Sequence, residues 1–300
     1  MNILVSVNQK YVNQLKTLLF SLGKNNPQRK NIYLMSSELS EDTLQELALF
    51  TENKCNSRLH TIVVDSELFE NAKIMSHFSV EMYYRIFAVK YLPCSLDRIL
   101  WLDADIIVKG TISKFYQSDF EGKSFIVCSH RELDENQQRS SIEARKRLGL
   151  GSDVDYFNSG VILMNLPKIR KEFDREKAFY LINEFKDRLV YPDQDILNIL
   201  YEGDVKYADK MIYNYQVHYN WKYEGEQKFI EEKVKILHYV GPVKPWGYQT
   251  YHFSYEYYWQ YYLMFGKRTD YYVNFILRLC YDAYKKIKYF GRMILKWKKE

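Results

Sequence analysis

Two aspartates in the middle of the chain carry the clearest chemical signal. An apolar run at residues 99–102 leads directly into Asp103-Ala104-Asp105, and residues 106–108 are apolar again. Ligands of open α/β sheets bind beyond the carboxyl ends of the strands. Two carboxylates crowded against apolar residues repel each other and lose solvation, so a divalent cation is their natural partner. The alternative is a pair of solvated turn aspartates.

The D-x-D spacing is weak evidence when taken alone. The same spacing occurs at residues 153–155 and at residues 193–195. Only Asp103 follows a strong apolar run that reads as a buried strand. We therefore expect the metal at the first match, with the other two serving elsewhere.

Alternating strands and helices predict the sheet that must position these aspartates. Strands alternating with helices imply a mostly parallel α/β sheet. Ser40 is the expected N-cap of the second helix, because two acidic residues follow it in the first turn. The expected strands are residues 3–7, 31–35, 59–64, 98–102, 125–128, 159–165 and 235–239, and the expected helices are 11–22, 40–50, 80–91, 173–189 and 195–200.

Composition indicates a globular chain, with 47% hydrophobic and 27% charged residues. A Tyr-dense and then basic stretch follows Trp246, so we expect a catalytic domain over residues 1–250 and a tail over residues 251–300. The four cysteines are widely spaced and form no C-x-x-C pair, which argues against a zinc or redox motif. The N-terminus lacks the basic leader of a secretory signal, so we expect a cytoplasmic protein.

Charge is distributed unevenly along the chain. The net charge is +5, yet residues 267–300 alone carry ten Lys and Arg against three Asp and Glu, which leaves the remainder weakly acidic. An enzyme acting on nucleic acid would line its main cleft with basic residues. We therefore expect no nucleic-acid partner.

Six ordered blocks resemble one enzyme family over about residues 1–250. The family is glycosyltransferase family 8, the retaining enzymes that include bacterial lipopolysaccharide galactosyl- and glucosyltransferases and glycogenin. The resemblance implies a GT-A type fold, with a Rossmann-like, mostly parallel sheet flanked by helices and a helical C-terminal appendage. The blocks are residues 3–8, 79–85, 98–105, 157–166, 192–195 (Pro-Asp-Gln-Asp) and 238–246 (His-Tyr-Val-Gly-Pro-Val-Lys-Pro-Trp).

The resemblance implies a bound manganese ion, with magnesium as the alternative. Its ligands would be Asp103, Asp105 and His238. Imidazole together with carboxylates suits manganese better than magnesium. Without the resemblance, His238 would more often be a core histidine than a ligand.

The resemblance also implies a UDP-sugar donor. Gly241 and Lys244 resemble a diphosphate clamp, because glycine lets the backbone approach a phosphate and lysine supplies a compact cation. Their alternative is a surface turn. Arg85 resembles a donor-binding arginine, or alternatively pairs with Asp103 and orients it.

Nucleoside contacts are implied near the end of the first strand. Ser6 and Asn8 match positions that contact the nucleoside, although many relatives have an aspartate where Asn8 stands. Ala104, between the two expected metal ligands, belongs to the same donor site.

Positions that contact the transferred sugar in similar enzymes match Asn158, Asp193 and Gln194. We favour front-face attack by the acceptor hydroxyl, with Gln194 steadying the oxocarbenium-like centre while the metal and Lys244 neutralise the departing UDP. The alternative is a double displacement in which Asp193 or Asp195 is the nucleophile, by analogy with retaining glycosidases.

The tail is predicted to form a basic amphipathic helix over residues 271–299. Apolar residues follow helical spacing, and Arg278, Lys285, Arg292 and Lys299 recur every seven positions. Such a helix can lie on an anionic membrane surface and bring the active site to a glycan or a lipid-linked oligosaccharide at the inner face of the cell membrane. Alternatively, it docks on the catalytic domain or on the partner in a homo-oligomer.

Two other functions compete with sugar transfer. A non-catalytic UDP-sugar or glycan-binding protein would keep the same fold, but the set of Asp103, Asp105 and His238 argues against it. A nucleotidyltransferase also uses paired aspartates and a divalent cation, but the blocks at Asn158 and Gly241 disfavour that class. The donor hexose, galactose or glucose, and the acceptor stay open.

Overall fold

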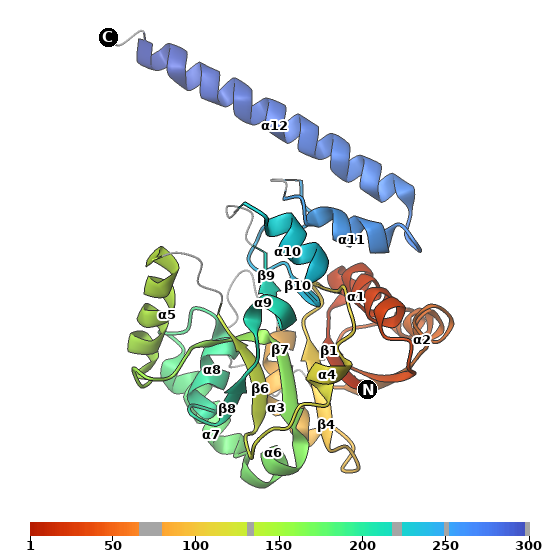
Figure 1. Ribbon diagram of the computed structural model, residues 1–300, viewed down its shortest axis with the longest axis vertical. Helices are drawn as coiled ribbons and strands as arrows, with labels where there is room; N and C mark the ends of the chain where they lie inside the picture. The colour runs from red at the N-terminus through yellow and green to blue at the C-terminus, as the bar shows by residue number, and fades with distance from the viewer. Residues whose placement is uncertain (66–79, 131–134, 218–223, 249–251, 298–300) are drawn as a thin grey trace. The chain divides into compact units, whose positions relative to one another are not determined.

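The chain folds into two compact units in the computed structural model (Figure 1). The larger unit holds Met1–Gln216 and Lys233–His238, and the smaller holds Val217–Glu232 and Tyr239–Glu300. The single boundary expected near Thr250 falls on a residue outside the described part of the chain. The structure describes residues 1–65, 80–130, 135–217, 224–248 and 252–297.

A seven-stranded sheet forms the centre of the larger unit. Its strands are β1 (Asn2–Ser6), β2 (Lys30–Ser36), β3 (Ser57–Val63), β4 (Arg98–Leu102), β6 (Phe125–Ser129), β7 (Phe157–Asn165) and β8 (Val205–Tyr207). They lie in the order β3-β2-β1-β4-β7-β6-β8. Neighbouring strands are parallel except that β7 runs antiparallel to both β4 and β6. This confirms the predicted mostly parallel α/β sheet.

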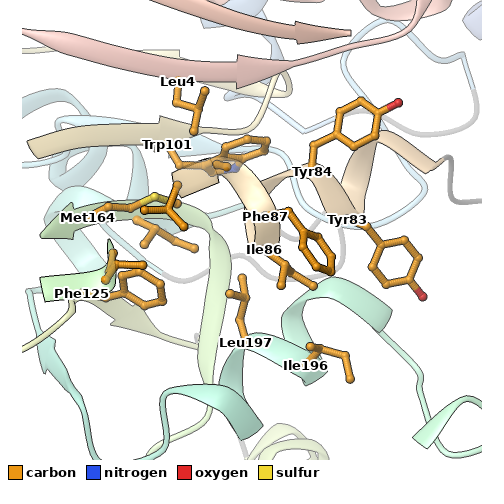
Figure 2. Packing of buried hydrophobic residues seen from close by; sticks show 14 of the residues in the cluster. Leu4, Tyr83, Tyr84, Ile86, Phe87, Trp101, Phe125, Met164, Ile196 and Leu197 are labelled. Carbon is orange, nitrogen blue, oxygen red and sulfur yellow. The ribbon is translucent and has the colours of Figure 1, made fainter. Parts of the chain in front are cut away.

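Both faces of this sheet are buried at its central strands, which explains why β1, β4 and β7 read as largely apolar runs. Ile99 and Trp101 of β4 face one core, whereas Leu100 faces the other. Figure 2 shows the first core, in which Trp101 lies near Leu4 and Phe87. Helices α3 (Tyr84–Phe87), α6 (Leu166–Glu172), α7 (Arg175–Phe185) and α8 (Pro192–Leu200) contribute to this core, and α1 (Val12–Asn25) and α2 (Glu41–Cys55) contribute to the other.

Local sequence signals explain several helix ends. Ser40 caps α2 as expected, because its hydroxyl accepts a hydrogen bond from the backbone N–H of Thr43 at 3.3 Å. The helix expected over residues 80–91 is confirmed in part: the one-turn helix α3 is flanked directly by 3₁₀ helices at Val80–Tyr83 and Ala88–Lys90. Every residue from 81 to 89 is buried. The segment is therefore helical as expected, but both of its ends are wound as tighter 3₁₀ turns.

A second, three-stranded sheet includes the strand that follows β4 in the chain. It contains β5 (Ile106–Val108), β9 (Tyr215–Gln216) and β10 (Ile236–His238), in the order β5-β10-β9. Strand β10 pairs antiparallel with β5, with His238 opposite Ile106. This pairing sets His238 beside the turn between β4 and β5. The remaining helices of the larger unit are α4 (Ser113–Tyr116), α5 (Glu135–Leu148) and α9 (Lys210–Tyr213).

The smaller unit contains α10 (Glu226–Glu232), α11 (Tyr255–Tyr262) and α12 (Arg268–Trp297). The beginning of α12 packs on this unit through a polar side chain, because Asn274 donates hydrogen bonds to the carbonyl oxygens of Trp246 (2.9 Å) and Gly247 (3.2 Å). No helix in the described part of the chain is long and apolar enough to span a bilayer. The expected tail residues 298–300, and all side chains beyond residue 288, lie outside the described part.

Candidate active site

Strand directions explain why the site forms at one edge of the large sheet. Parallel strands β1 and β4 end at the same edge, and the antiparallel β7 begins there. The backbone N–H of Asp103, just past β4, donates to the carbonyl oxygen of Gly160 at 2.9 Å. The sheet therefore brings Asp103 and the Asn158-Ser159-Gly160 segment together, although they are far apart in sequence.

Asp103, Asp105 and His238 form the cluster that the sequence predicts. One ligand atom from each lies within 4.8 Å of the others. Nε2 of the buried His238 is 3.2 Å from an Asp105 carboxylate oxygen and 3.8 Å from one of Asp103. Two carboxylates and an imidazole converging in this way form a suitable donor set for a divalent transition metal.

Gly160 makes room for this cluster. A Cβ atom added at Gly160 would overlap Cε1 of His238 and would lie 2.8 Å from its Nδ1 and 2.9 Å from Oδ2 of Asp103. Glycine is therefore required here for close approach of side chains to the strand, and not for an unusual backbone angle.

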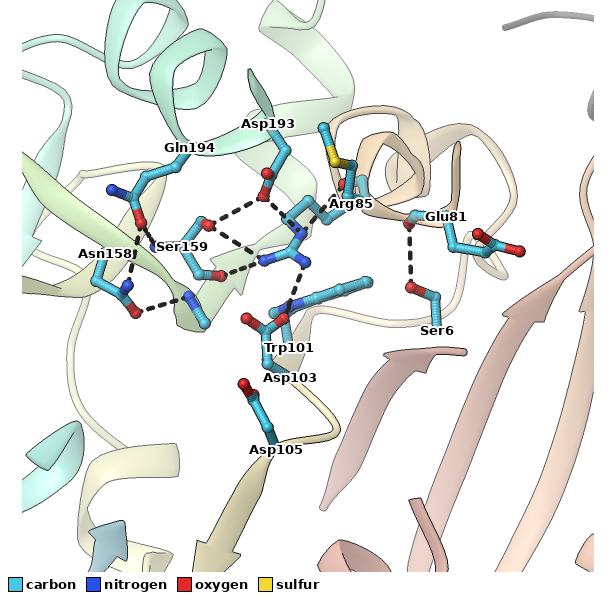
Figure 3. A network of polar contacts seen from close by, with 12 residues as sticks. Ser6, Glu81, Arg85, Trp101, Asp103, Asp105, Asn158, Ser159, Asp193 and Gln194 are labelled. Atoms are coloured by element: carbon cyan, nitrogen blue, oxygen red, sulfur yellow. Dashed lines mark hydrogen bonds and ion pairs between the residues drawn. The ribbon is translucent and has the colours of Figure 1, made fainter. Parts of the chain in front are cut away.

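Arg85 is buried and engaged with protein groups on every side (Figure 3). Its guanidinium contacts Asp103 at 2.9 Å and Asp193 at 3.2 Å, and donates to the carbonyl oxygen of Ser159 at 2.8 Å. It also lies over the Trp101 ring, 4.4 Å from the centroid. These contacts fit the alternative in which Arg85 orients Asp103.

Burial and neighbouring charges act in opposite directions on the pKa values of Arg85 and Asp193. Burial alone would lower the pKa of Arg85, but the carboxylates of Asp103 and Asp193 outweigh it and raise this pKa above its ordinary value. Burial raises the pKa of Asp193, and the Arg85 guanidinium offsets this only in part. Arg85 therefore stays charged and acts as the permanent cation of the site.

Asn158, Asp193 and Gln194 are brought together as expected. Oε1 of Gln194 accepts from Nδ2 of Asn158 at 3.0 Å and from the backbone N–H of Ser159 at 3.1 Å. The hydroxyl of Ser159 donates to Asp193 at 3.0 Å. All four side chains are buried, and their hydrogen bonds join the start of α8 to the start of β7.

Asp195 occupies a separate cluster. Its carboxylate is 0% exposed and pairs with both terminal nitrogens of Arg147, at 2.9 and 3.1 Å. It also accepts from the Tyr156 hydroxyl (2.5 Å) and from the backbone N–H groups of Val190 (2.8 Å) and Tyr191 (3.1 Å). A carboxylate with five donors is held as a structural anchor that joins α5 to α8.

Four other residues are expected to contact the UDP-sugar: Ser6, Asn8, Gly241 and Lys244. The Ser6 hydroxyl donates to the carbonyl oxygen of Glu81 at 3.1 Å, and the Asn8 side chain accepts from the backbone N–H of Lys10 at 3.1 Å. Gly241 and Lys244 belong to the smaller unit, where Nζ of Lys244 donates to the carbonyl oxygen of Tyr239 at 2.6 Å. Their contact with a donor stays a prediction.

Sequence reasoning missed Ser159 and Asn214 as site residues. Asn214 precedes β9 and is fully buried, with its Oδ1 at 2.9 Å from Nδ1 of His238. Nothing in the spacing around Asn214 marks it, because the contact joins the residue before the two-residue strand β9 to His238 in the three-residue strand β10. Ser159 stands inside the block at residues 157–166, and that block was the available signal.

Comparisons with known proteins identify the family. The model of glycosyl transferase family 8 matches residues 2–250. The lipopolysaccharide 1,2-glucosyltransferase of Escherichia coli K12 is 27% identical over 263 residues, covering 86% of this chain and 76% of the relative. The lipopolysaccharide 1,3-galactosyltransferase of Salmonella typhimurium is 25% identical over 241 residues, covering 77% and 70%.

Solved structures share the fold. The crystal structure of the galactosyltransferase LgtC in complex with donor and acceptor sugar analogues superposes with a TM-score of 0.76 at 22% identity, covering 88% of this chain and 96% of LgtC. The glycosyltransferase GlyE of Streptococcus pneumoniae gives a TM-score of 0.64 at 22% identity, covering 88% of this chain and 61% of GlyE. With its family match, its α/β sheet and its Asp-Asp-His cluster, this chain belongs to glycosyltransferase family 8 and has a GT-A type fold.

Proposed function

We propose that the chain is a retaining, manganese-dependent hexosyltransferase. It moves galactose or glucose from a UDP-sugar to a hydroxyl of a cell-surface glycan or lipid-linked acceptor. The observation that carries this proposal is the convergence of Asp103, Asp105 and His238 at the sheet edge. The named lipopolysaccharide glucosyl- and galactosyltransferase relatives support the hexose and the class of acceptor.

The residues present fit a divalent metal. Asp103 and Asp105 supply oxygens and His238 supplies nitrogen, a mixed set that favours manganese over magnesium. Arg85 pairs with one oxygen of Asp103 and leaves the other facing His238. When bound, the metal supplies positive charge that neutralises the departing diphosphate.

The rest of the donor site is proposed from the blocks that the chain shares with its family. Ser6 and Asn8, at and just beyond the end of β1, contact the nucleoside, and Ala104 lies in the same turn as the metal ligands. Gly241 and Lys244 hold the diphosphate, because Gly241 has a φ of +77° and presents its backbone without a side chain.

The contacts of the carboxylates favour front-face attack over a double displacement. Asp195 is enclosed by protein donors, and Asp193 is buried against Arg85 and Ser159. Neither is presented as a free nucleophile. Gln194 and Asn158, held rigidly by each other, are the groups proposed to contact the transferred hexose and steady positive charge at its C1.

We also propose that α12 holds the enzyme at the inner face of the cell membrane. The helix packs on its own unit through Asn274, and Arg278 is also buried, whereas Tyr272, Ile276 and Ile287 are 56%, 56% and 72% exposed. Exposed apolar and basic residues on one helix suit an anionic bilayer surface.

Release of UDP from UDP-galactose and UDP-glucose, with and without manganese, tests the proposed chemistry. Asp103→Asn should lower release by about 100-fold or more, because it removes a charged metal ligand. Asp153→Asn is the matched control, since Asp153 is exposed and belongs to another D-x-D match. Equal rates for Asp103→Asn and wild type would contradict the metal role. Metal-dependent UDP binding without turnover of any sugar or acceptor would favour a binding protein.

A further inference from the structure

A continuous line of buried hydrogen bonds joins α8 to the histidine of the metal cluster. Nδ2 of Asn158 donates to Oε1 of Gln194 at 3.0 Å, and Nδ2 of Asn214 donates to Oδ1 of Asn158 at 2.9 Å. Oδ1 of Asn214 then lies 2.9 Å from Nδ1 of His238. None of these four side chains is more than 8% exposed, and Asn214 is 0% exposed.

Two backbone N–H groups dictate the direction of this line. The N–H of Ser159 points at Oε1 of Gln194 (3.1 Å), and the N–H of Gly160 points at Oδ1 of Asn158 (3.0 Å). A backbone N–H can only donate, so the atoms facing it must be amide oxygens. Asn158 therefore offers its nitrogen to Gln194, and Asn214 must offer its nitrogen to Asn158.

The last step determines which ring nitrogen of His238 carries hydrogen. With its nitrogen turned to Asn158, Asn214 presents only an oxygen to Nδ1 of His238. Nδ1 must donate to that oxygen, because the reverse arrangement would bury two acceptors against each other. In a neutral imidazole the other nitrogen then keeps its lone pair. That nitrogen, Nε2, is the atom facing Asp105 at 3.2 Å and Asp103 at 3.8 Å.

We propose that Asn214 is a positioning residue that keeps hydrogen on Nδ1 of His238 and so leaves Nε2 as the ring nitrogen that a metal ion would bind. This deepens the manganese-dependent transfer proposed above and rests on it. A metal-bound histidine commonly donates its other N–H to a protein oxygen, and loss of that partner weakens metal binding by about 10- to 100-fold. Here the partner also ties the metal ligand to Gln194 through one hydrogen-bonded line.

The tautomer can be read directly in the metal-free, full-length protein. Long-range ¹H–¹⁵N correlation spectra of ¹⁵N-histidine-labelled protein distinguish a hydrogen-bearing nitrogen from one with a free lone pair, and the His238→Gln variant assigns the signals. Wild type should show hydrogen on Nδ1 of His238. An Nδ1 without hydrogen in wild type would overturn the proposal, whether or not Nε2 carries hydrogen toward Asp105, and this test needs no variant of Asn214 to fold.

Variants at Asn214 test the consequence for metal binding. Asn214→Ala should release Nδ1, populate the Nε2–H tautomer and weaken Mn²⁺ binding by about 10- to 100-fold, measured as free Mn²⁺ by electron paramagnetic resonance. Asn214→Asp keeps an oxygen facing Nδ1, so it should keep hydrogen on Nδ1 where Asn214→Ala does not, although its second oxygen then faces Oδ1 of Asn158 in place of the amide nitrogen. Wild-type affinity in Asn214→Ala would overturn the proposal.

Asn26 offers a matched control. It is also an asparagine with 0% exposure, and its side chain makes three hydrogen bonds, to Leu22 (3.2 Å), Gly110 (3.4 Å) and Ile112 (3.0 Å). Asn26→Ala should lose stability while leaving the His238 tautomer and Mn²⁺ affinity unchanged. Equal losses of affinity in Asn26→Ala and Asn214→Ala would overturn the proposal.

The measurements separate this proposal from the one on which it rests. If wild type binds no Mn²⁺, the proposed metal dependence fails, while the tautomer in the metal-free protein still decides the role of Asn214. If wild type binds Mn²⁺ and Asn214→Ala binds it equally well, only the role of Asn214 fails.

Discussion

Replacing Gly160 with alanine tests how closely the proposed metal ligands are packed. The new Cβ would overlap Cε1 of His238 and would lie 2.8 Å from its Nδ1 and 2.9 Å from Oδ2 of Asp103. Ordinary contact begins at 3.4 Å, so the ring or the strand must move by at least about 0.6 Å, the difference from 2.8 Å. The atoms that must move belong to His238 and Asp103, two of the proposed metal ligands.

The expected loss is larger in catalysis than in stability. A displacement approaching 1 Å at a reacting centre costs about 100-fold in rate, so kcat/KM for UDP release should fall about 100-fold, or about 2.7 kcal/mol. Overpacking costs about 1–3 kcal/mol of unfolding free energy, and alanine in place of a strand glycine returns about 0.5–1 kcal/mol. Urea unfolding should therefore show at most a modest change.

Gly110→Ala is the control for this experiment. A Cβ at Gly110 would lie 2.6 Å from Cδ of Lys235, a flexible side chain that can swing aside. Its kcat/KM and Mn²⁺ affinity should match wild type. Wild-type kcat/KM in folded Gly160→Ala would refute the reasoning, because the enzyme would then tolerate displaced ligands.

Three further outcomes are expected. Burial lowers the pKa of His130 to about 4, so the unfolded chain binds a proton below about pH 6.5 that the folded chain does not. Between pH 6.5 and 4, wild type should lose about 3 kcal/mol of unfolding free energy relative to His130→Gln in paired urea titrations, and parallel losses would contradict this. Tyr156→Phe removes a hydrogen-bond donor from the buried Asp195 carboxylate and should lower the free energy of urea unfolding by about 1–3 kcal/mol. Its rate of UDP release should stay within a few-fold of wild type. A loss of UDP release as large as that of Asp103→Asn would instead give Asp195 a chemical role. Replacing the exposed Ile276 and Ile287 with serine should reduce sedimentation with anionic liposomes, and unchanged binding would exclude this face of α12 as the membrane contact.

Long apolar strands could be read from the sequence with good accuracy. The strand predicted at residues 98–102 matches β4, and the strands predicted near residues 3–7 and 31–35 correspond to β1 and β2. Each is buried on both faces, so the sequence signal is a continuous apolar run that local reading detects. The pair Asp103 and Asp105 followed, because Asp103 comes directly after such a strand, whereas His238 was expected only from the family resemblance.

Short and fully enclosed elements could not be read in the same way. Strands β5 and β9 have three and two residues, which is too few to show a period. The segment at residues 80–91 is helical as its spacing predicts, but only Tyr84–Phe87 is α-helix and the residues on either side are 3₁₀ helix. Tertiary packing decides the backbone at such places.

The sequence by itself determined the α/β class, the pair Asp103 and Asp105 at a strand end, and the family, because these depend on short runs of neighbouring residues. Only the tertiary structure decided that Arg85 holds Asp103, that Asp195 is an enclosed anchor and that Asn214 contacts His238. These roles depend on which donor faces which acceptor across strands and helices that are distant in the chain. Spacing along the sequence carries no record of such contacts, since they form only when the sheet edge is assembled.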